Sequence, residues 1–220
     1  MSKIVLFENK KDCCGCSACV NVCPKGAIEM SADENGFIYP VIDDEKCVEC
    51  RICKKVCGYQ KQTENLENIC TWVAINQIDE MLKKSASGGA FSAIAEEVIE
   101  NGGTVFGSAM ILENNNLTPK HICINKLDDL NKLLGSKYVQ SFIGDTYIQA
   151  RKLLNEKKIV LFSGTPCQVA GLYGFLGNKN YDNLFTIDII CHGVPSAAFF
   201  QGYITCLLYT SDAADDLIGV

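Results

Sequence analysis

The sequence has no long uninterrupted apolar run. Its apolar stretches are broken by charges or glycines well before the ~18 residues that a membrane-spanning helix needs, so we expect no membrane span. The first residues also lack a secretory signal, because the apolar run Ile4 to Phe7 ends at once in Glu8, Asn9 and Lys10. Together these two absences predict a soluble chain that stays in the cytoplasm.

A basic surface is also missing. The chain carries 20 lysines and arginines against 26 acidic residues, which gives a formal charge of −6. No stripe of basic residues runs along the sequence, and this argues against a nucleic-acid partner and in favour of small ligands or other proteins. Hydrophobic residues make up 48% of the chain, which is enough for one or two folded domains with a core.

Residues 206–220 differ in character from the rest of the chain. The string CLLYTSDAADD resembles the translation of a transposon adapter used in sequencing libraries, so we expect the natural reading frame to stop near Thr205. Setting this segment aside removes three aspartates and no base, which changes the formal charge from −6 to −3. A genuine amphipathic C-terminus is the alternative.

Cysteine, by contrast, is abundant, with 14 in 220 residues. Structural disulfides do not persist in a reducing compartment, so this number indicates metal or cluster ligation. The cysteines form an internal repeat. The first run has the spacing C-x2-C-x2-C-x3-C followed by Pro24, and the second repeats it 34 residues later with Gly58 in place of the proline. This spacing is typical of bacterial ferredoxins with two 4Fe-4S clusters.

The spacing also predicts which thiolates share a cluster. Three cysteines close together can wrap one cube, whereas the fourth of each run starts a short helix and binds the other cube. Cluster I is therefore assigned Cys13, Cys16, Cys19 and Cys57, and cluster II is assigned Cys47, Cys50, Cys53 and Cys23. Cys14 is left over, and we expect it to be a packing residue. Zinc sites also use paired cysteines, but a zinc knuckle needs only two per motif, so two clusters are the favoured interpretation.

The remaining pattern predicts secondary structure. Short apolar runs at 27–30 and 37–42 flank a turn-rich segment and predict a hairpin between the two cysteine runs. After a linker at 61–68, we expect strands at 69–75, 104–112, 117–124, 158–162 and 184–190, and helices at 90–101, 126–134 and 145–156. The predicted fold class is α+β, with a ferredoxin domain over residues 1–60 followed by an α/β domain over 69–205.

Two further cysteines follow predicted strands. Cys167 lies in the loop Gly-Thr-Pro-Cys-Gln, and Cys191 lies in the loop Cys-His-Gly-Val-Pro. Because the carboxyl ends of parallel strands share one edge of a sheet, we expect both thiols to face one pocket. Each is also expected at the start of a helix, whose dipole favours thiolate. Simple packing is the alternative for both. His121, in a predicted strand, is expected to satisfy a backbone carbonyl.

Residues 85–91, SASGGAF, place glycines directly before a predicted helix. Glycines let a phosphate approach the backbone, and the free amides of a helix start point toward it, which suits a flavin or nucleotide pyrophosphate. An ordinary capped helix start is the alternative. The loop at 135–141, GSKYVQS, adds a lysine and hydroxyls, for which a solvated loop is the alternative.

Four motifs, SASGGAF, GSKYVQS, VLFSGTPCQVAGL and DIICHGVP, occur in this order behind the cysteine repeat. Over roughly residues 10–205 the sequence thereby resembles the family formed by the beta subunits of coenzyme F420-reducing hydrogenase and F420-linked formate dehydrogenase. The resemblance implies an α/β domain of flavin type that holds FAD. The implied flavin contacts are Ser87, Gly88, Gly89, Lys137 and Tyr138. The resemblance also implies that Cys167 and Cys191 contribute to a further cluster or a redox centre.

The implied function is that of an iron-sulfur flavoprotein oxidoreductase. Clusters exchange single electrons and hydride carriers exchange two, and FAD converts between the two regimes. The implied partners are coenzyme F420 or another small-molecule hydride carrier, and a redox partner protein or hydrogenase or dehydrogenase subunit. No catalytic residue is assigned. A non-catalytic ferredoxin-type electron carrier or iron-sulfur sensor is the alternative.

Overall fold

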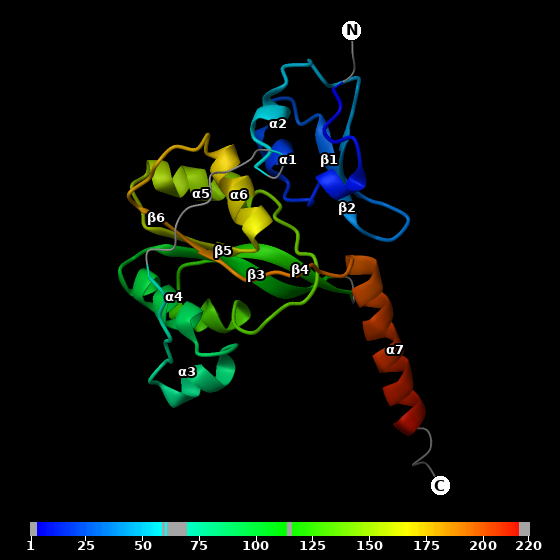
Figure 1. The fold of residues 1–220 in the computed structure, drawn as a ribbon. Helices are drawn as coiled ribbons and strands as arrows, with labels where there is room; N and C mark the ends of the chain where they lie inside the picture. The colour runs from blue at the N-terminus through cyan, green and yellow to red at the C-terminus, as the bar shows by residue number, and fades with distance from the viewer. Residues whose placement is uncertain (1–3, 59, 61–69, 114–115, 216–220) are drawn as a thin grey trace.

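The computed structural model describes residues 4–58, 60, 70–113 and 116–215 (Figure 1). The helices are α1 (Ala18–Val22), α2 (Ile52–Lys55), α3 (Asp79–Lys84), α4 (Ala90–Glu100), α5 (Thr146–Asn155), α6 (Pro166–Phe175) and α7 (Ala197–Asp215), with 3-10 turns η1 (Lys10–Asp12) and η2 (Leu127–Lys132). The strands are β1 (Ile28–Ala32), β2 (Ile38–Ile42), β3 (Thr104–Glu113), β4 (Asn116–Ile124), β5 (Val160–Gly164) and β6 (Leu184–Asp188). Within the described ranges, none of these helices combines the length and the apolarity needed to cross a membrane.

The cysteine repeat is reproduced in the backbone. Gly15 and Glu49 occupy equivalent positions of the two runs and have φ values of 68° and 51°. Ser17 and Arg51, two residues further on, have φ values of 61° and 58°. The left-handed conformation at both positions curls each cysteine loop around its own interior before α1 or α2 begins. Sequence and backbone therefore share the same period.

The predicted hairpin between the two runs is present. β1 pairs antiparallel with β2, from Ile28 opposite Ile42 to Ala32 opposite Ile38. Asp33 supports the turn between the strands, because its carboxylate accepts hydrogen bonds from the backbone N–H groups of Asn35 and Phe37 at 3.0 and 2.9 Å. The hairpin holds the two cysteine runs side by side.

The second part of the chain is built on a four-stranded sheet in the order β4-β3-β5-β6. β3 pairs antiparallel with β4 and parallel with β5, and β5 pairs parallel with β6. Every residue of β5 is buried, as expected for a central strand covered on both faces. The strands predicted at 104–112, 117–124, 158–162 and 184–190 are confirmed within two residues at each end, as are the helices at 90–101 and 145–156.

The short helix of each cysteine run precedes the fourth cysteine instead of starting at it, because α1 ends at Val22 and α2 ends at Lys55. Two elements predicted in the second part of the chain are also wrong. The helix predicted at 126–134 is a short 3-10 turn, η2. The strand predicted at 69–75 is irregular over residues 70–75, and Trp72 and Val73 are 82% and 103% exposed. Apolar, β-branched composition favours a strand only where a neighbouring strand can pair with its backbone, and Asn76 N–H instead donates to Gly88 O at 2.7 Å. Residue 69, the linker predicted at 61–68 and residues 114–115 lie outside the described residues.

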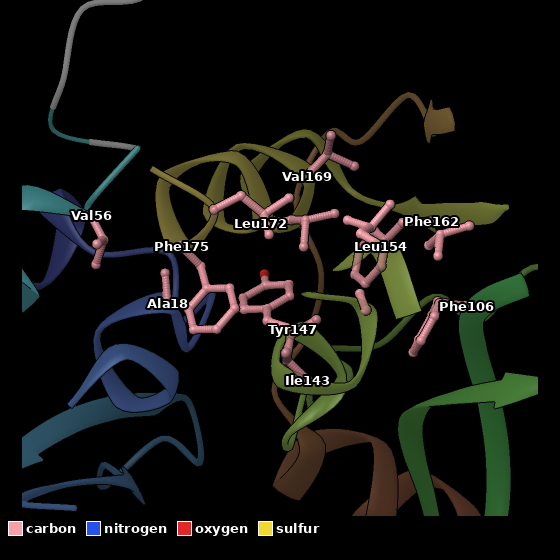
Figure 2. Close-up of a cluster of buried hydrophobic side chains, with 13 residues drawn as sticks. Ala18, Val56, Phe106, Ile143, Tyr147, Leu154, Phe162, Val169, Leu172 and Phe175 are labelled. Atoms are coloured by element: carbon pink, nitrogen blue, oxygen red, sulfur yellow. The ribbon is translucent and has the colours of Figure 1, made fainter. Parts of the chain in front are cut away.

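Two buried clusters cover opposite faces of the sheet. β5 alternates between them, because Phe162 belongs to the cluster beneath α5 and α6 whereas Leu161 belongs to the cluster beneath α4. Figure 2 shows that Ala18 and Val56 of the cysteine-rich part belong to the same cluster as Phe162. The cysteine-rich part and the sheet-containing part therefore share a core at their junction (Figure 1).

Candidate metal centres

Two small cavities in the N-terminal part are lined by cysteines. The first cavity is lined by the set predicted for cluster I, Cys13, Cys16, Cys19 and Cys57, and also by Cys14 and by Cys53, which is assigned to cluster II. The second is lined by the set predicted for cluster II: Cys23, Cys47, Cys50 and Cys53. Apolar residues such as Phe7 and Pro40 beside the first cavity and Ile28 and Ile42 beside the second complete the walls. The structure thus brings each predicted set together, and the ligand assignment itself stays a prediction.

The cysteine loops place backbone N–H groups against the sulfurs. Ala27 N–H donates to Cys23 Sγ at 3.3 Å. Burial nevertheless dominates at two of the cysteines assigned to cluster I, where it raises the pKa of Cys13 to about 11 and also raises the pKa of Cys19. A buried thiol gives up its proton only when another positive charge compensates the thiolate. The sites therefore fit cationic iron, which supplies that charge and accepts thiolate ligands.

The cysteines surround each cavity, an arrangement that suits an inorganic cube held by four thiolates.

Cys14, expected to be a packing residue, lies where the two parts of the chain meet. It lines the cluster I cavity together with Cys16. Hydrogen bonding with Cys14 lowers the pKa of Cys16 and lowers the pKa of Cys167 to about 6, and the same interactions raise the pKa of Cys14. Thr165 Oγ1 adds a hydrogen bond to Cys167 Sγ at 3.1 Å. We call Cys14, Cys16 and Cys167 the sulfur junction.

Helix α6 approaches the cysteine loops through its small residues. A Cβ on Gly171 would lie 3.0 Å from Cys16 Sγ, and a Cβ on Gly58 would lie 2.7 Å from Ala170 O. Side chains at these positions would hold the two parts apart, so glycine permits the contact. Gly58 is the residue that replaces Pro24 of the first run. The cavity of cluster I therefore lies against α6.

The two cysteines predicted to follow strands differ in their surroundings. Cys167 lies in the first turn of α6, as predicted. Cys191 is exposed after β6, where Gly193 N–H donates to its Sγ at 3.4 Å. The prediction that Cys191 starts a helix is wrong, because α7 begins only at Ala197. A pocket shared by the two thiols stays a prediction.

The glycine loop precedes α4 as predicted. Gly89 is the N-cap residue with a φ of 74°, and no side chain caps the helix, so a cap does not compete for the amides of the first turn. Ser87 also has a positive φ, at 56°. Gly88 has a packing role, because a Cβ there would overlap the carbonyl oxygen of Ala74. The backbone amides at the start of α4, next to Ser87 and Gly89, are therefore the place where this loop could hold an anionic group.

The other two predicted flavin contacts lie on the loop after η2. Lys137 Nζ donates to the carbonyl oxygen of Leu134 at 2.7 Å, and burial lowers the pKa of Lys137. Tyr138 is 81% exposed. The aliphatic stem of Lys137 is thus partly covered, whereas the Tyr138 ring is available to solvent or to a ligand.

A buried polar chain connects β4 to α6. His121 Nε2 donates to Ser163 O at 3.1 Å, as expected for a histidine that satisfies a carbonyl, and Nδ1 then accepts from Ser141 Oγ at 3.1 Å. Gln168 Nε2 donates to the same hydroxyl at 3.0 Å. Burial lowers the pKa of His121 to about 4, so the ring is neutral and rigidly oriented at neutral pH.

Sequence reasoning missed one large open cavity of about 740 Å³ along β4. Its walls come from the end of β3, from β4, from the loop before α5 and from the first residues of α5: Glu113, Thr118, Lys120, His121, Ile122, Cys123, Phe142, Ile143, Gly144, Asp145, Thr146 and Gln149. Lys120 pairs with Glu113 inside it, so these two charges compensate each other. No local sequence signal marks this cavity, because segments distant in the sequence form it.

Residues 12–61 match a 4Fe-4S dicluster domain. The chain is 26% identical to a subunit of the F420H2 dehydrogenase of Methanosarcina mazei over 81% of this chain and 53% of that protein. It is 26% identical to an uncharacterized protein of Methanocaldococcus jannaschii over 76% of this chain and 54% of that protein. The chain thus spans about half the length of these curated relatives.

Two further comparisons cover parts of the chain. An uncharacterized ferredoxin of Methanocaldococcus jannaschii is 37% identical over 54 residues, which are 24% of this chain and 69% of that protein. Among solved structures, the F420-reducing [NiFe] hydrogenase complex of Methanosarcina barkeri matches with a TM-score of 0.47 and 19% identity, over 59% of this chain and 46% of that chain.

Proposed function

We propose that this chain passes single electrons from cluster II through cluster I to a flavin in the α/β part. The chain is an iron-sulfur electron-transfer protein that carries a 4Fe-4S dicluster domain and is related to a subunit of F420H2 dehydrogenase. The observation that carries this proposal is the position of the two cavities. The cluster I cavity lies against α6, since Cys16 and Gly171 are in contact. The cluster II cavity has exposed Cys50 and Val48 in its wall, where a partner could deliver electrons.

The α/β part offers a place for the flavin. FAD, when bound, would convert single electrons into hydride equivalents. The amides of the first turn of α4 fit its pyrophosphate, with Ser87, Gly88 and Gly89 forming the loop and Lys137 and Tyr138 adding contacts. Gly88 fits less directly, because the carbonyl oxygen of Ala74 occupies the space where a Cβ of residue 88 would lie. The role of Gly88 is then to fix the loop so that the neighbouring amides stay accessible.

The hydride partner follows from the kind of complex to which the relative belongs. A relative that is part of F420H2 dehydrogenase implies coenzyme F420 as donor or acceptor, and another component of such a complex as the redox partner. The chain's own contribution is to bury the sulfurs of cluster I and to donate amide hydrogen bonds to them, which sets the potential at which electrons arrive.

The decisive experiment quantifies iron, sulfide and flavin together in protein purified without air. Two cubes require about eight irons and eight sulfides per chain, and the proposal expects one FAD beside them. Full iron without flavin would contradict the flavin step and favour a ferredoxin-type carrier or sensor. Zinc in a colourless sample would contradict both clusters.

A pair of lysine variants separates flavin binding from cluster binding. Lys137→Met removes a proposed flavin contact and should lower the flavin content while leaving the iron content unchanged. Lys179→Met, an exposed residue in the turn after α6, is the matched control and should change neither. Equal flavin content in both variants would remove Lys137 from the proposed site.

A further inference from the structure

The loop at 135–141, which carries two of the proposed flavin contacts, also touches the first cysteine run. The side-chain oxygen of Gln140, Oε1, accepts a hydrogen bond from the N–H of Ile38 in β2 at 3.2 Å. The side-chain nitrogen, Nε2, lies against Gly15, where an added Cβ would come within 2.6 Å of it. Gly15 belongs to the first cysteine run and lines the cluster I cavity. Gln140 therefore joins the α/β part to the loop that wraps cluster I.

The orientation of this carboxamide is fixed by its partner. Ile38 N–H needs an acceptor, and only the oxygen of a carboxamide accepts, so Oε1 faces β2 and Nε2 faces Gly15. The backbone around the side chain is held as well, because Val139 is buried and Gln140 N–H donates to Pro195 O at 3.2 Å. The positive end of the amide dipole thus points at the cluster I loop.

The internal repeat supplies a comparison for this contact. Glu49 occupies in the second run the position of Gly15 in the first, and both residues have the left-handed backbone conformation. Glu49 is exposed. A Cβ at position 15 would instead meet Gln140 Nε2 and also Ile38 O, which lies 2.7 Å from the position of that Cβ. The two loops therefore share a backbone shape, and the α/β part contributes a polar neighbour to the first.

We propose that Gln140 raises the reduction potential of cluster I from the α/β part. Cluster I gains one electron without making or breaking a bond, so its reduced form carries one additional negative charge. The positive end of a neighbouring amide dipole stabilises that charge, since hydrogen bonds and dipoles around the sulfurs tune cluster potentials. This role rests on the two clusters of the proposed function and is independent of the flavin.

Two substitutions separate the dipole from the hydrogen bond. Gln140→Glu keeps the side-chain length and an oxygen that can accept from Ile38 N–H, but it replaces the amide hydrogens with a negative charge. Gln140→Met keeps a similar volume and removes both the dipole and the hydrogen bond. Gln77→Glu introduces the same charge at an exposed position before α3, which lies away from the cysteine-rich part (Figure 1). It is the matched control.

The measurement is a redox titration of cluster-loaded protein without air, followed by electron paramagnetic resonance. The two clusters should be reduced in two one-electron steps. In Gln140→Glu one step should move to lower potential, so that the ratio of reduced to oxidised cluster at a fixed applied potential falls about tenfold. Gln140→Met should move the same step by less, and Gln77→Glu should move neither. That step should be absent from Cys57→Ser, which we expect to hold cluster II alone.

A purely structural role predicts a different order. Gln140→Glu would then match the wild type because it keeps the hydrogen bond, and only Gln140→Met would differ. That order, or unchanged potentials in both variants at full iron content, would overturn the proposal. Loss of iron from Gln140→Glu would show that the side chain holds the loop together instead of tuning the cluster, with the same consequence. A shifted step that Cys57→Ser retains would assign the effect to cluster II and would also overturn it.

The proposed function fails in a different way. Absence of flavin from the wild-type preparation would contradict its flavin step and leave the expected shift in Gln140→Glu intact. Zinc in place of both clusters would overturn both proposals, and it would be evident in the wild type before any variant is compared. Loss of the shift in protein that holds iron and flavin would overturn only the role of Gln140.

Discussion

The junction between the cysteine loops and α6 predicts opposite effects for the same substitution at two helical glycines. A Cβ on Gly174 would overlap the carbonyl oxygen of Val56 and lie 3.0 Å from its carbonyl carbon. A Cβ on Gly202, in α7, meets no atom within 4 Å. Both glycines lie inside helices, so alanine gains up to about 1 kcal/mol of helix propensity at each position. Only at Gly174 is this gain opposed by a clash.

The clash should exceed the gain. Overpacking a well-packed site costs about 1–3 kcal/mol, and the upper part of that range applies when the obstructing atom belongs to the backbone. Gly174→Ala should therefore lower the free energy of unfolding by about 1–2 kcal/mol net. A chain of this size loses roughly 2–4 °C of Tm per kcal/mol, so the Tm should fall by roughly 2–8 °C. Gly202→Ala should leave the Tm unchanged or raise it.

The assay is thermal unfolding of the cluster-loaded protein, followed by circular dichroism without air. Iron release to a chelator is measured in parallel, because Val56 immediately precedes Cys57 and a displaced Val56 should loosen cluster I. If Gly174→Ala unfolded at or above the wild-type temperature, the close approach of α6 to the cysteine loops would be refuted. A Tm change of the same sign in both variants would refute the claim that a clash opposes the gain in helix propensity only at Gly174.

Three further predictions concern single side chains. Burial lowers the pKa of His121 to about 4, against about 6.5 in the unfolded chain. The resulting contribution of about 3 kcal/mol to the free energy of unfolding is therefore full above pH 6.5 and is lost as the pH falls toward 4. Between pH 7 and pH 5, urea unfolding should show a larger loss of unfolding free energy in the wild type than in His121→Asn. Tyr147→Phe removes a buried hydrogen bond of 2.7 Å to Gln168 O and should lower the free energy of unfolding by about 1 kcal/mol in the same assay. Cys57→Ser and Cys23→Ser should each lower the iron content by about half, from about eight irons per chain; loss of all iron in only one of them would contradict the crossed assignment.

The sequence made the cysteine repeat and the sheet predictable because both depend on local patterns. The spacing of Cys13, Cys16 and Cys19 demands a curled backbone, and the structure supplies it with left-handed residues that recur at equivalent positions. β5 was predictable because a short apolar run between turns is typical of a central strand. The match of residues 12–61 to a dicluster domain agrees with the first of these patterns.

The strand expected at 69–75 shows where local patterns fail. Trp72 and Val73 have high β propensity, yet over the described residues 70–75 their backbone pairs with no strand and their side chains are exposed. Strand formation depends on a partner, and a partner is a property of the whole fold. The sulfur junction was missed for the same reason, since Cys14 and Cys167 are far apart in the sequence and only the packing of α6 brings them together.

One departure from the repeat nevertheless carried information about this packing. The two cysteine runs have the same spacing, so their differences must come from what each run contacts. Pro24 follows α1 and its C-cap residue Cys23. Position 58, by contrast, approaches the backbone of Ala170 so closely that even a Cβ would lie 2.7 Å from its carbonyl oxygen. A proline at 58 would place its ring in the same space. The glycine therefore identifies the second run's fourth cysteine, Cys57, and with it cluster I, as the side of the ferredoxin part that faces the α/β part.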